Sequence, residues 1–497
     1  MLRVIGLRQK HSRYEPSATQ IGRPTTSMVS LKFRAGGPTQ AVNWGFFFLR
    51  IAIVGSIFTL LFLSQRFWYI TTWRVTANWG SRTLRVAVRL IYIAALLLVI
   101  LATADGFRMG HGHIIPRGNL ITILAGLWFS SALFAYFAVK TVRVIERLWH
   151  WLHRAHQGKA RAASGGSTQH SAAAYSTAAE TVADPSRRYF FRTASIAAGA
   201  APFLGAMYGF AAERLNYQVR RVEIPLPNLP PALDGMKIAQ LSDIHLSGYM
   251  PRSQVRRAVD MANDLGADLA VVTGDFITGA GDPIADCIDE LHRLYAPLGV
   301  WGCNGNHEVY AKAEGTAEIL FEQAGMKLLR SENAQLTFRG ASFNLLGVDY
   351  QRERTPSGRR VQMLSGIGSL VRRDMPNILL SHNPNSFNRA AELGIELSLA
   401  GHTHGGQVQV EILDHRLSPA RFITDYIAGQ FQRPLFAPSL DDRAWQNSPK
   451  RVEPRLANFE ATRGNAVLYV NRGLGTVGAP VRLGVPPEIT LLILRRA

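Results

Sequence analysis

The sequence predicts an α-helical membrane region followed by an α/β domain. Three long apolar runs lie between residues 46 and 139. From Val222 onward, short strand-like runs alternate with helical patterns such as Val255 to Leu265 and Gly315 to Ala324. This alternation is typical of a mostly parallel sheet with helices on its faces. Charge divides the chain in the same place, because residues 1–220 contain 26 Lys and Arg against 6 Asp and Glu, whereas residues 221–497 contain 29 of each.

The three apolar runs predict about three transmembrane helices within residues 44–140. They extend from Phe46 to Leu63, from Val86 to Ala104 and from Leu120 to Val139. Each approaches the ~20 residues that are needed to cross a ~30 Å hydrocarbon layer. Buried helices of a soluble protein do not explain three such runs in so short a window. Residues 1–43, which are basic and contain scattered Gly, Pro, Ser and Thr, are predicted to form a flexible tail.

The region after the third run predicts a linker and then an export signal or a fourth membrane helix. Residues 141–192 are basic, and their middle part is rich in Ala, Ser and Gly, which is typical of a linker. The paired Arg187 and Arg188 precede a mildly apolar stretch from Ala194 to Ala212. Residues 193–213 therefore resemble a twin-arginine signal. The alternative is an ordinary fourth transmembrane helix after a basic flank.

Loop charges favour an orientation in which the domain after residue 213 lies outside the cytoplasm. With residues 141–192 (net +5) inside, residues 105–118 (net +1) lie outside and residues 64–85 (net +4) lie inside. These three loops agree with the positive-inside rule. The basic tail would then lie outside, which disagrees with the rule. The tail assignment, the first helix or the whole orientation could each be the source of this conflict.

The net charge of +20 does not predict nucleic-acid binding. All of it lies in the membrane part, where orientation explains it, and the neutral C-terminal part has no charge to follow a phosphate backbone. The two cysteines, Cys287 and Cys303, are too few for a disulfide framework and form no C-x-x-C motif. We therefore expect buried free thiols.

Five strand-like runs in the C-terminal part each end in Asp, Asn or His. The clearest end is Gly401-His402-Thr403-His404-Gly405-Gly406, because two histidines at i and i+2 point the same way on a strand end or a turn. In α/β sheets, ligands bind at the carboxyl ends of strands, so these ends predict a metal site at one sheet edge. The other four ends contain Asp243-Ile244-His245, Gly274-Asp275, Gly305-Asn306-His307-Glu308 and His382-Asn383-Pro384.

These five blocks, in this order, resemble the calcineurin-like metallophosphoesterase superfamily over about residues 235–497. Two further features, Gly405-Gly406-Gln407 and Arg472-Gly473-Leu474-Gly475, resemble its membrane-anchored bacterial branch. Relatives in that branch act on cell-wall material or on the diphosphate of a lipid A precursor. The resemblance implies that residues 222–497 form a sandwich of two β-sheets flanked by helices.

The resemblance also implies two divalent metal ions and a role for each residue. His307 would protonate the leaving oxygen or stabilise the phosphoryl charge, and Glu308 would orient the imidazole of His307. Arg472 would contact phosphate, although a structural role in a glycine turn explains it equally well. Ligands of these types, without Cys, suit Mn, Fe or Zn. The implied metal ligands are Asp243, His245 and His404 for one ion, Asn306, His382 and His402 for the other, and Asp275 as a bridge.

The function implied is that of a membrane-anchored phosphohydrolase that cleaves a phosphoester or a diphosphate bond by two-metal catalysis. The expected location is the bacterial inner (plasma) membrane, as a multi-pass protein with an extracytoplasmic catalytic domain. The expected partners are the lipid bilayer and a phosphorylated lipid- or envelope-derived substrate, with no nucleic acid. Two alternatives are the same enzyme facing the cytoplasm and a receptor or scaffold that binds a phosphorylated ligand without turnover. Residues 431–462 are interpreted as a lid or a lipid-facing loop.

Overall fold

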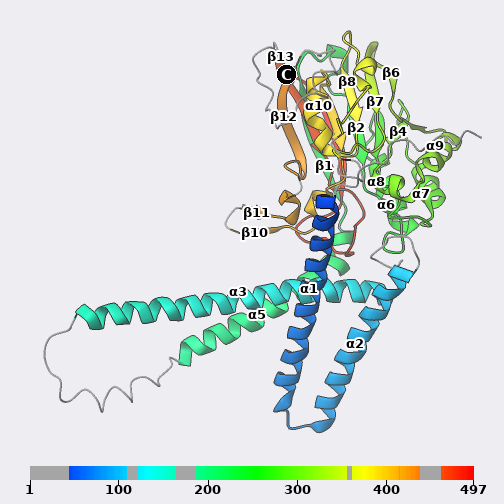
Figure 1. Cartoon of the computed structure of the whole chain (residues 1–497). Helices are drawn as coiled ribbons and strands as arrows, with labels where there is room; N and C mark the ends of the chain where they lie inside the picture. The colour runs from blue at the N-terminus through cyan, green and yellow to red at the C-terminus, as the bar shows by residue number, and fades with distance from the viewer. Residues whose placement is uncertain are drawn as a thin grey trace, which may run out of the picture.

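The computed structural model describes residues 44–108, 120–163, 185–354, 361–412, 415–422, 424–436 and 461–497. The expected tail 1–43 lies outside the described residues. The same holds for residues 164–184 of the expected linker and for residues 437–460 of the expected lid or loop. A group of long helices from the N-terminal half joins a domain of strands and shorter helices from the C-terminal half (Figure 1).

Four long helices form the N-terminal part: α1 (Trp44–Ala77), α2 (Arg82–Arg108), α3 (Leu120–Ala163) and α5 (Pro185–Ala211). Helices α3 and α5 pack side by side, and α1 and α2 form a hairpin that contacts α3 (Figure 1). Where α1 meets α3, Ser64 Oγ and Trp68 Nε1 donate hydrogen bonds to the carbonyl oxygen of Ala132, at 3.0 and 2.8 Å. All three apolar runs of the sequence are therefore helical.

Helix α3 extends further than the sequence prediction. It ends at Ala163, so residues 141–163 of the expected linker are helical, and α5 begins at Pro185 within the same segment. Residues 141–157 contain neither Gly nor Pro and are rich in side chains that a helix accommodates well. The linker prediction was wrong for these residues because it took the end of the apolar run as the end of the helix.

Two helical stretches in the described part of the chain are long and apolar enough to cross a membrane. They are Gly126–Leu152 in α3 and Ser186–Leu215, which covers α5 from its second residue and continues through Glu213–Leu215. Large apolar side chains of α5 are exposed, among them Leu204, Met207 and Tyr208. Exposed apolar side chains on a helix of this length indicate membrane association.

The C-terminal part is a sandwich of two six-stranded sheets flanked by helices, which confirms the predicted fold class. A separate hairpin consists of β10 (Val410–Ile412) and β11 (His415–Leu417). The first sheet has the order β1 (Gln218–Leu226), β14 (Glu488–Arg496), β2 (Lys237–Leu241), β3 (Leu269–Thr273), β4 (Val300–Cys303), β5 (Lys327–Leu328). The second has the order β12 (Gly429–Phe436), β13 (Ala461–Val470), β9 (Leu397–Ala400), β8 (Asn377–Leu380), β7 (Ala341–Gly347), β6 (Glu332–Phe338).

The strands at the centre of each sheet run parallel, as the alternation of strands and helices predicted. Strands β2, β3 and β4 pair in parallel in the first sheet, and β7, β8 and β9 do so in the second. The exceptions are antiparallel pairs between β14 and β2, β6 and β7, and β12 and β13. Parallel neighbours end at the same sheet edge, so loops that are distant in the sequence meet there.

An apolar core fills the space between the two sheets. Ile238 and Val271 of the first sheet are fully buried in one cluster with Leu345 and Leu399 of the second. The next residue along β3, Val272, points to the opposite face, because side chains alternate along a strand. Three helices cover that outer face: α6 (Arg252–Asn263), α7 (Ile284–Leu291) and α9 (Glu314–Gln323).

Shorter helices complete the domain. Helix α8 (Asn306–Ala311) follows β4, and α10 (Phe387–Glu392) packs against the outer face of the second sheet. Cys287 and Cys303 are buried and free, as predicted. The 3₁₀ helices are η1 (Glu213–Leu215), η2 (Pro231–Leu233), η3 (Ile367–Leu370), η4 (Pro384–Ser386), η5 (His404–Gly406) and η6 (Pro419–Phe422).

Candidate metal centre

The residues predicted to bind metal converge at one edge of the sandwich. Each follows the carboxyl end of a strand: β2, β3 and β4 in the first sheet, and β8 and β9 in the second. Only His402 is partly exposed, whereas the other six are buried. The structure thus brings together all seven residues: Asp243, His245, Asp275, Asn306, His382, His402 and His404.

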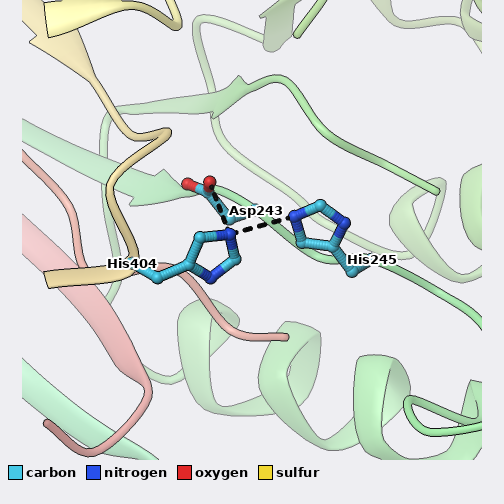
Figure 2. A group of neighbouring side chains, drawn as sticks. All are labelled: Asp243, His245 and His404. Carbon is cyan, nitrogen blue, oxygen red and sulfur yellow. Dashed lines mark hydrogen bonds and ion pairs between the residues drawn. The ribbon is translucent and has the colours of Figure 1, made fainter. Parts of the chain in front are cut away.

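One group of side chains consists of Asp243, His245 and His404 (Figure 2). The Nε2 atom of His404 lies 3.3 Å from Asp243 Oδ1 and 3.1 Å from His245 Nε2. Two imidazole nitrogens and one carboxylate oxygen therefore face a common point. This is a set of donors that a divalent transition metal accepts.

A second group consists of Asp275, His382, His402 and Asn306. Asp275 Oδ2 lies 3.0 Å from His382 Nε2, and His402 Nδ1 lies 2.7 Å from Asn306 Oδ1. The same Asp275 oxygen is 3.5 Å from the Nε2 atom of His245 in the first group. Asp275 thus lies between the two groups, in the place that a bridging carboxylate requires.

The environment of His382 fits a metal ligand. Its Nδ1 lies 2.6 Å from the carbonyl oxygen of Thr273, and a carbonyl oxygen can only accept, so Nδ1 carries the proton. The Nε2 atom is buried and faces the Asp275 carboxylate, with Oδ2 at 3.0 Å. Metal-binding histidines commonly use one nitrogen for the metal and the other for such an acceptor.

The charges of the site also fit a bound cation. Burial lowers the pKa of both His245 and His404 well below the ordinary value, which keeps their imidazoles neutral and able to bind metal. Burial also lowers the pKa of His382, but the carboxylates of Asp275 and Asp243 outweigh this effect and raise it to about 10. The two buried carboxylates thus favour a positive charge beside them, and a metal ion would supply it.

The backbone at the site adopts an uncommon conformation. Five of the seven residues have positive φ, with values between 48° and 73°. Such residues cost free energy and cluster at functional sites, where the surrounding structure enforces them. The backbone next to His402 is also tightly packed, because a Cβ on Gly401 would lie 2.1 Å from Asp243 Oδ2. The five residues are Asp243, His245, Asp275, His402 and His404.

Glu308 does not have the predicted role. Its carboxylate accepts hydrogen bonds from the backbone N–H groups of Asp275, Phe276 and Gly305, each at 2.8 Å. It therefore positions the Asp275 loop and caps α8. The prediction that Glu308 orients His307 was wrong, because successive side chains of a helix point in different directions.

His307 lies next to both groups of side chains. Its ring centroid is 4.6 Å from that of His245, and its backbone N–H donates to Asp275 Oδ1 at 2.9 Å. The Nδ1 atom lies 2.5 Å from the carbonyl oxygen of Thr278, so this carbonyl, and not Glu308, orients the imidazole. His307, His245 and Asp275 also form a third group that could hold a metal ion.

The two arginines beside the site differ in how well the sequence indicated them. Arg472, predicted to contact phosphate, forms an ion pair with Glu488 at 3.2 Å, in agreement with the structural alternative. Arg482, which the sequence analysis missed, is fully buried and its Nη2 lies 3.5 Å from His404 Nδ1. Tyr350 was also missed, and its ring centroid lies 5.5 Å from that of His402. Neither Arg482 nor Tyr350 belongs to a recognisable sequence motif.

The arrangement of these side chains agrees with a family comparison. Residues 236–406 match the family model for calcineurin-like phosphoesterases. The chain contains a calcineurin-like phosphoesterase domain. The matched range includes all seven residues of the two groups and ends at Gly406. The matched range corresponds to most of the two-sheet sandwich; β1 lies before it, and β12, β13 and β14 lie after it.

Curated relatives of the phosphoesterase domain include proteins from animals and bacteria. A transmembrane protein with metallophosphoesterase domain from Bos taurus is 29% identical over 293 residues, which cover 56% of this chain and 57% of the relative. The metallophosphoesterase YkuE of Bacillus subtilis is 27% identical, with 62% of this chain and 98% of YkuE covered. The UDP-2,3-diacylglucosamine pyrophosphatase LpxG of Chlamydia trachomatis is 25% identical, with 59% and 94% covered. The chain thus spans little more than half of the bovine protein.

Proposed function

We propose that this chain is a membrane-anchored, metal-dependent phosphohydrolase that cleaves a phosphoester or diphosphate bond. The observation that carries the proposal is the convergence of imidazoles, carboxylates and one amide oxygen in two adjoining groups. Asp275 would bridge the two ions. The other ligands would be Asp243, His245 and His404 for the first ion, and Asn306, His382 and His402 for the second.

Two bound cations would supply Lewis-acid activation of a phosphoryl group and of the attacking water. The donors are nitrogen and oxygen atoms without any thiolate, which suits Mn, Fe or Zn. The residues of the chain hold these donors in place before metal binds. The Thr273 carbonyl oxygen fixes the tautomer of His382, and the Glu308 carboxylate holds the backbone of Asp275.

His307 is the proposed proton donor to the leaving oxygen. The Thr278 carbonyl accepts a hydrogen bond from Nδ1, so the opposite ring nitrogen, Nε2, is the atom that exchanges a proton. General acid catalysis of this kind contributes typically 10²–10⁴-fold to the rate. The neighbouring imidazole of His245 and the Asp275 carboxylate place His307 at the edge of the metal centre.

The proposed substrate is a phosphorylated lipid or another envelope-derived amphiphile. Helix α5, which is apolar and long enough to span a membrane, ends directly beside the domain, where Arg482 N donates to the Gly209 carbonyl oxygen at 3.4 Å. A substrate held in the bilayer would therefore reach the site with little displacement. The relative LpxG, whose name is that of a UDP-2,3-diacylglucosamine pyrophosphatase, supports the same class of substrate.

We further propose a multi-pass protein of the bacterial inner membrane with the catalytic domain outside the cytoplasm. The paired Arg187 and Arg188 in the first turn of α5 support this orientation, because positive residues favour the cytoplasmic side. Alkaline phosphatase fused after Ala497 should be active in this orientation. An inactive fusion, with a cytoplasmic reporter active at the same position, would place the domain inside.

The activity is tested with the full-length protein in detergent micelles. Hydrolysis of bis-p-nitrophenyl phosphate is measured with Mn²⁺, Zn²⁺ or Fe²⁺ after removal of bound metal. We expect metal-dependent hydrolysis that His382→Ala abolishes, and then turnover of phosphorylated lipids from a panel that also contains nucleotides and wall-derived phosphates. Metal binding without hydrolysis of any compound in the panel would favour a phospho-ligand receptor instead.

A further inference from the structure

Arg482 is a fully buried arginine whose hydrogen bonds go to one turn of the backbone and to the loop that follows Arg482. Nε donates to the carbonyl oxygen of Gly475 at 3.1 Å, and Nη1 donates to that of Val485 at 3.2 Å. Nη2 lies 2.9 Å from the Arg472 carbonyl oxygen and 3.0 Å from the Gly473 carbonyl oxygen. Burial of a charge is costly unless hydrogen bonds replace its hydration, and these carbonyls do so. The guanidinium thereby fixes the turn 472–475.

The turn 472–475 packs closely against Asp243 and His245, which follow strand β2. The backbone N–H of Gly475 donates to the Asp243 carbonyl oxygen at 2.7 Å. A Cβ on Gly473 would lie 2.5 Å from the Cβ of Asp243, and one on Gly475 would lie 2.8 Å from the Cβ of His245. With contacts this close, any movement of the turn displaces two proposed ligands of the first metal ion.

Arg482 also borders the third ligand of that ion. Its Nη2 lies 3.5 Å from Nδ1 of His404, whose Nε2 faces Asp243 on the other side of the ring. A single buried side chain therefore touches the His404 ring directly and reaches Asp243 and His245 through the turn. Together these residues make up the whole first group.

The backbone of Arg482 is docked on the membrane-associated helix α5. Its N–H donates to the Gly209 carbonyl oxygen at 3.4 Å, and a Cβ on Gly209 would lie only 2.4 Å from the Arg482 carbonyl oxygen. Just after α5, the Glu213 carboxylate accepts a hydrogen bond from the N–H of Gly484 at 3.0 Å. The segment 481–485 is thus held between α5 and the metal centre.

We propose that Arg482 is a positioning residue that makes helix α5 part of the scaffold of the first metal ion. The inference rests on the proposed metal-dependent function. Helix α5 positions the Arg482 backbone, and the guanidinium then fixes the 472–475 turn and the His404 ring. Loss of residues that orient metal ligands typically lowers metal affinity 10–100-fold. Disturbing either end of this connection should therefore weaken metal binding without a change to any ligand.

The test measures Mn²⁺ affinity by titration calorimetry of the full-length, metal-free protein in detergent micelles. We expect Arg482→Met to weaken binding at the first ion at least 10-fold and Arg482→Lys to restore part of it, because a lysine can satisfy only some of the carbonyls. Arg372→Met is the control, since Arg372 is exposed and pairs with Asp374 on the surface. The control should bind Mn²⁺ as the wild type does.

A second variant keeps Arg482 and disturbs α5 instead. Gly209→Ala forces the Arg482 backbone to move, whereas Gly205→Ala, one turn earlier, places its Cβ 3.3 Å from a flexible Leu483 methyl group. We expect weaker Mn²⁺ binding and a smaller metal-induced rise in melting temperature for Gly209→Ala only. This variant decides the question if Arg482→Met does not fold.

The outcomes separate the inference from the proposed function. If the wild-type protein binds two ions and both Arg482→Met and Gly209→Ala retain wild-type Mn²⁺ affinity, the proposed role of Arg482 is overturned and the proposed function is not. A wild-type protein that binds no metal would overturn the proposed function, and this inference with it. Equal weakening in Gly205→Ala and Gly209→Ala would also contradict the connection, since only the second contact is rigid.

Discussion

The carboxylate of Asp243 accepts the backbone N–H of His402, at 2.9 Å to Oδ1 and 3.1 Å to Oδ2. Asp243 follows β2 of the first sheet, and His402 follows β9 of the second. A proposed ligand of one ion therefore holds the backbone of a proposed ligand of the other. This contact joins the two sheets at the metal centre. A change in the loop after β2 would therefore also affect the loop after β9, and with it the proposed ligands of the other ion.

The first prediction concerns His404, which belongs to the first group alone. His404→Ala removes one imidazole and leaves the second group intact, so we expect loss of one ion of the two and loss of measurable turnover. The fold should persist, because the ring contributes little to the apolar core. Metal content by mass spectrometry and circular dichroism check the two parts. Unchanged metal content with a wild-type rate would show that His404 is not a ligand.

Asp275 should behave differently, because its carboxylate lies between both groups. The Oδ2 atom is 3.0 Å from His382 Nε2 and 3.5 Å from His245 Nε2. Asp275→Asn keeps the shape of the side chain but removes the charge that two cations would share. We expect both ions to be lost together at metal concentrations that saturate the wild type. Stepwise loss of one ion only would argue against a bridging role.

The convergence of these seven side chains could be predicted because each motif is local. Asp243 and His245, or His402 and His404, are two residues apart, and each pair follows an apolar run that reads as a strand. Parallel strands then bring their ends together, so the position of the site followed from the fold class. The sequence also distinguished the two parts of the chain, because the N-terminal part is basic with long apolar runs and the C-terminal part has no net charge.

Arg482 and Glu308 could not be assigned in the same way. Arg482 acquires its role only because β14 returns the C-terminal segment to the first sheet, between β1 and β2. Such a long-range pairing leaves no local pattern. Glu308 stands beside His307 in the sequence, but its carboxylate turns back to the N-terminus of α8, where it accepts the backbone N–H of Gly305. The spacing of Gly305 and Glu308 could have indicated this cap.

Glu308→Gln is therefore expected to act on stability and on the Asp275 loop. The glutamine would present an NH₂ group to backbone N–H groups that now donate to a carboxylate, and leaving such buried donors unsatisfied costs about 2 kcal/mol. We expect a lower melting temperature, measured by differential scanning fluorimetry. Glu322→Gln, at an exposed carboxylate, is the matched control.

His307→Asn should show the opposite pattern. This side chain is the proposed proton donor, and it is partly exposed, so its loss should leave the melting temperature unchanged while kcat falls by about 10²–10⁴-fold. Metal content should stay at the wild-type level. A variant that loses an ion would instead support His307 as a ligand, together with His245 and Asp275.

The last prediction concerns the pH dependence of stability and lies away from the metal centre. Glu290 of α7 is buried and accepts hydrogen bonds from Arg256 and Arg252 of α6, with Arg256 Nη2 at 2.7 Å and Arg252 Nε at 2.9 Å. These hydrogen bonds lower the pKa of Glu290 from 4.5 to about 2, and the one from Arg256 has the largest effect. The ionised carboxylate therefore holds the two helices together.

The sign of the effect follows from the lowered pKa. The carboxylate of Glu290 binds a proton more tightly in the unfolded chain than in the folded one. The contribution of Glu290 to the free energy of unfolding is therefore complete above pH 4.5 and is lost as the pH falls toward 2. Glu290→Gln should lower the melting temperature at pH 7, and its difference from the wild type should shrink as the pH is lowered to about 3. Glu332→Gln, at an exposed position, should match the wild type throughout. A difference that stays constant over this range would mean that packing, and not the charge of Glu290, joins α6 to α7.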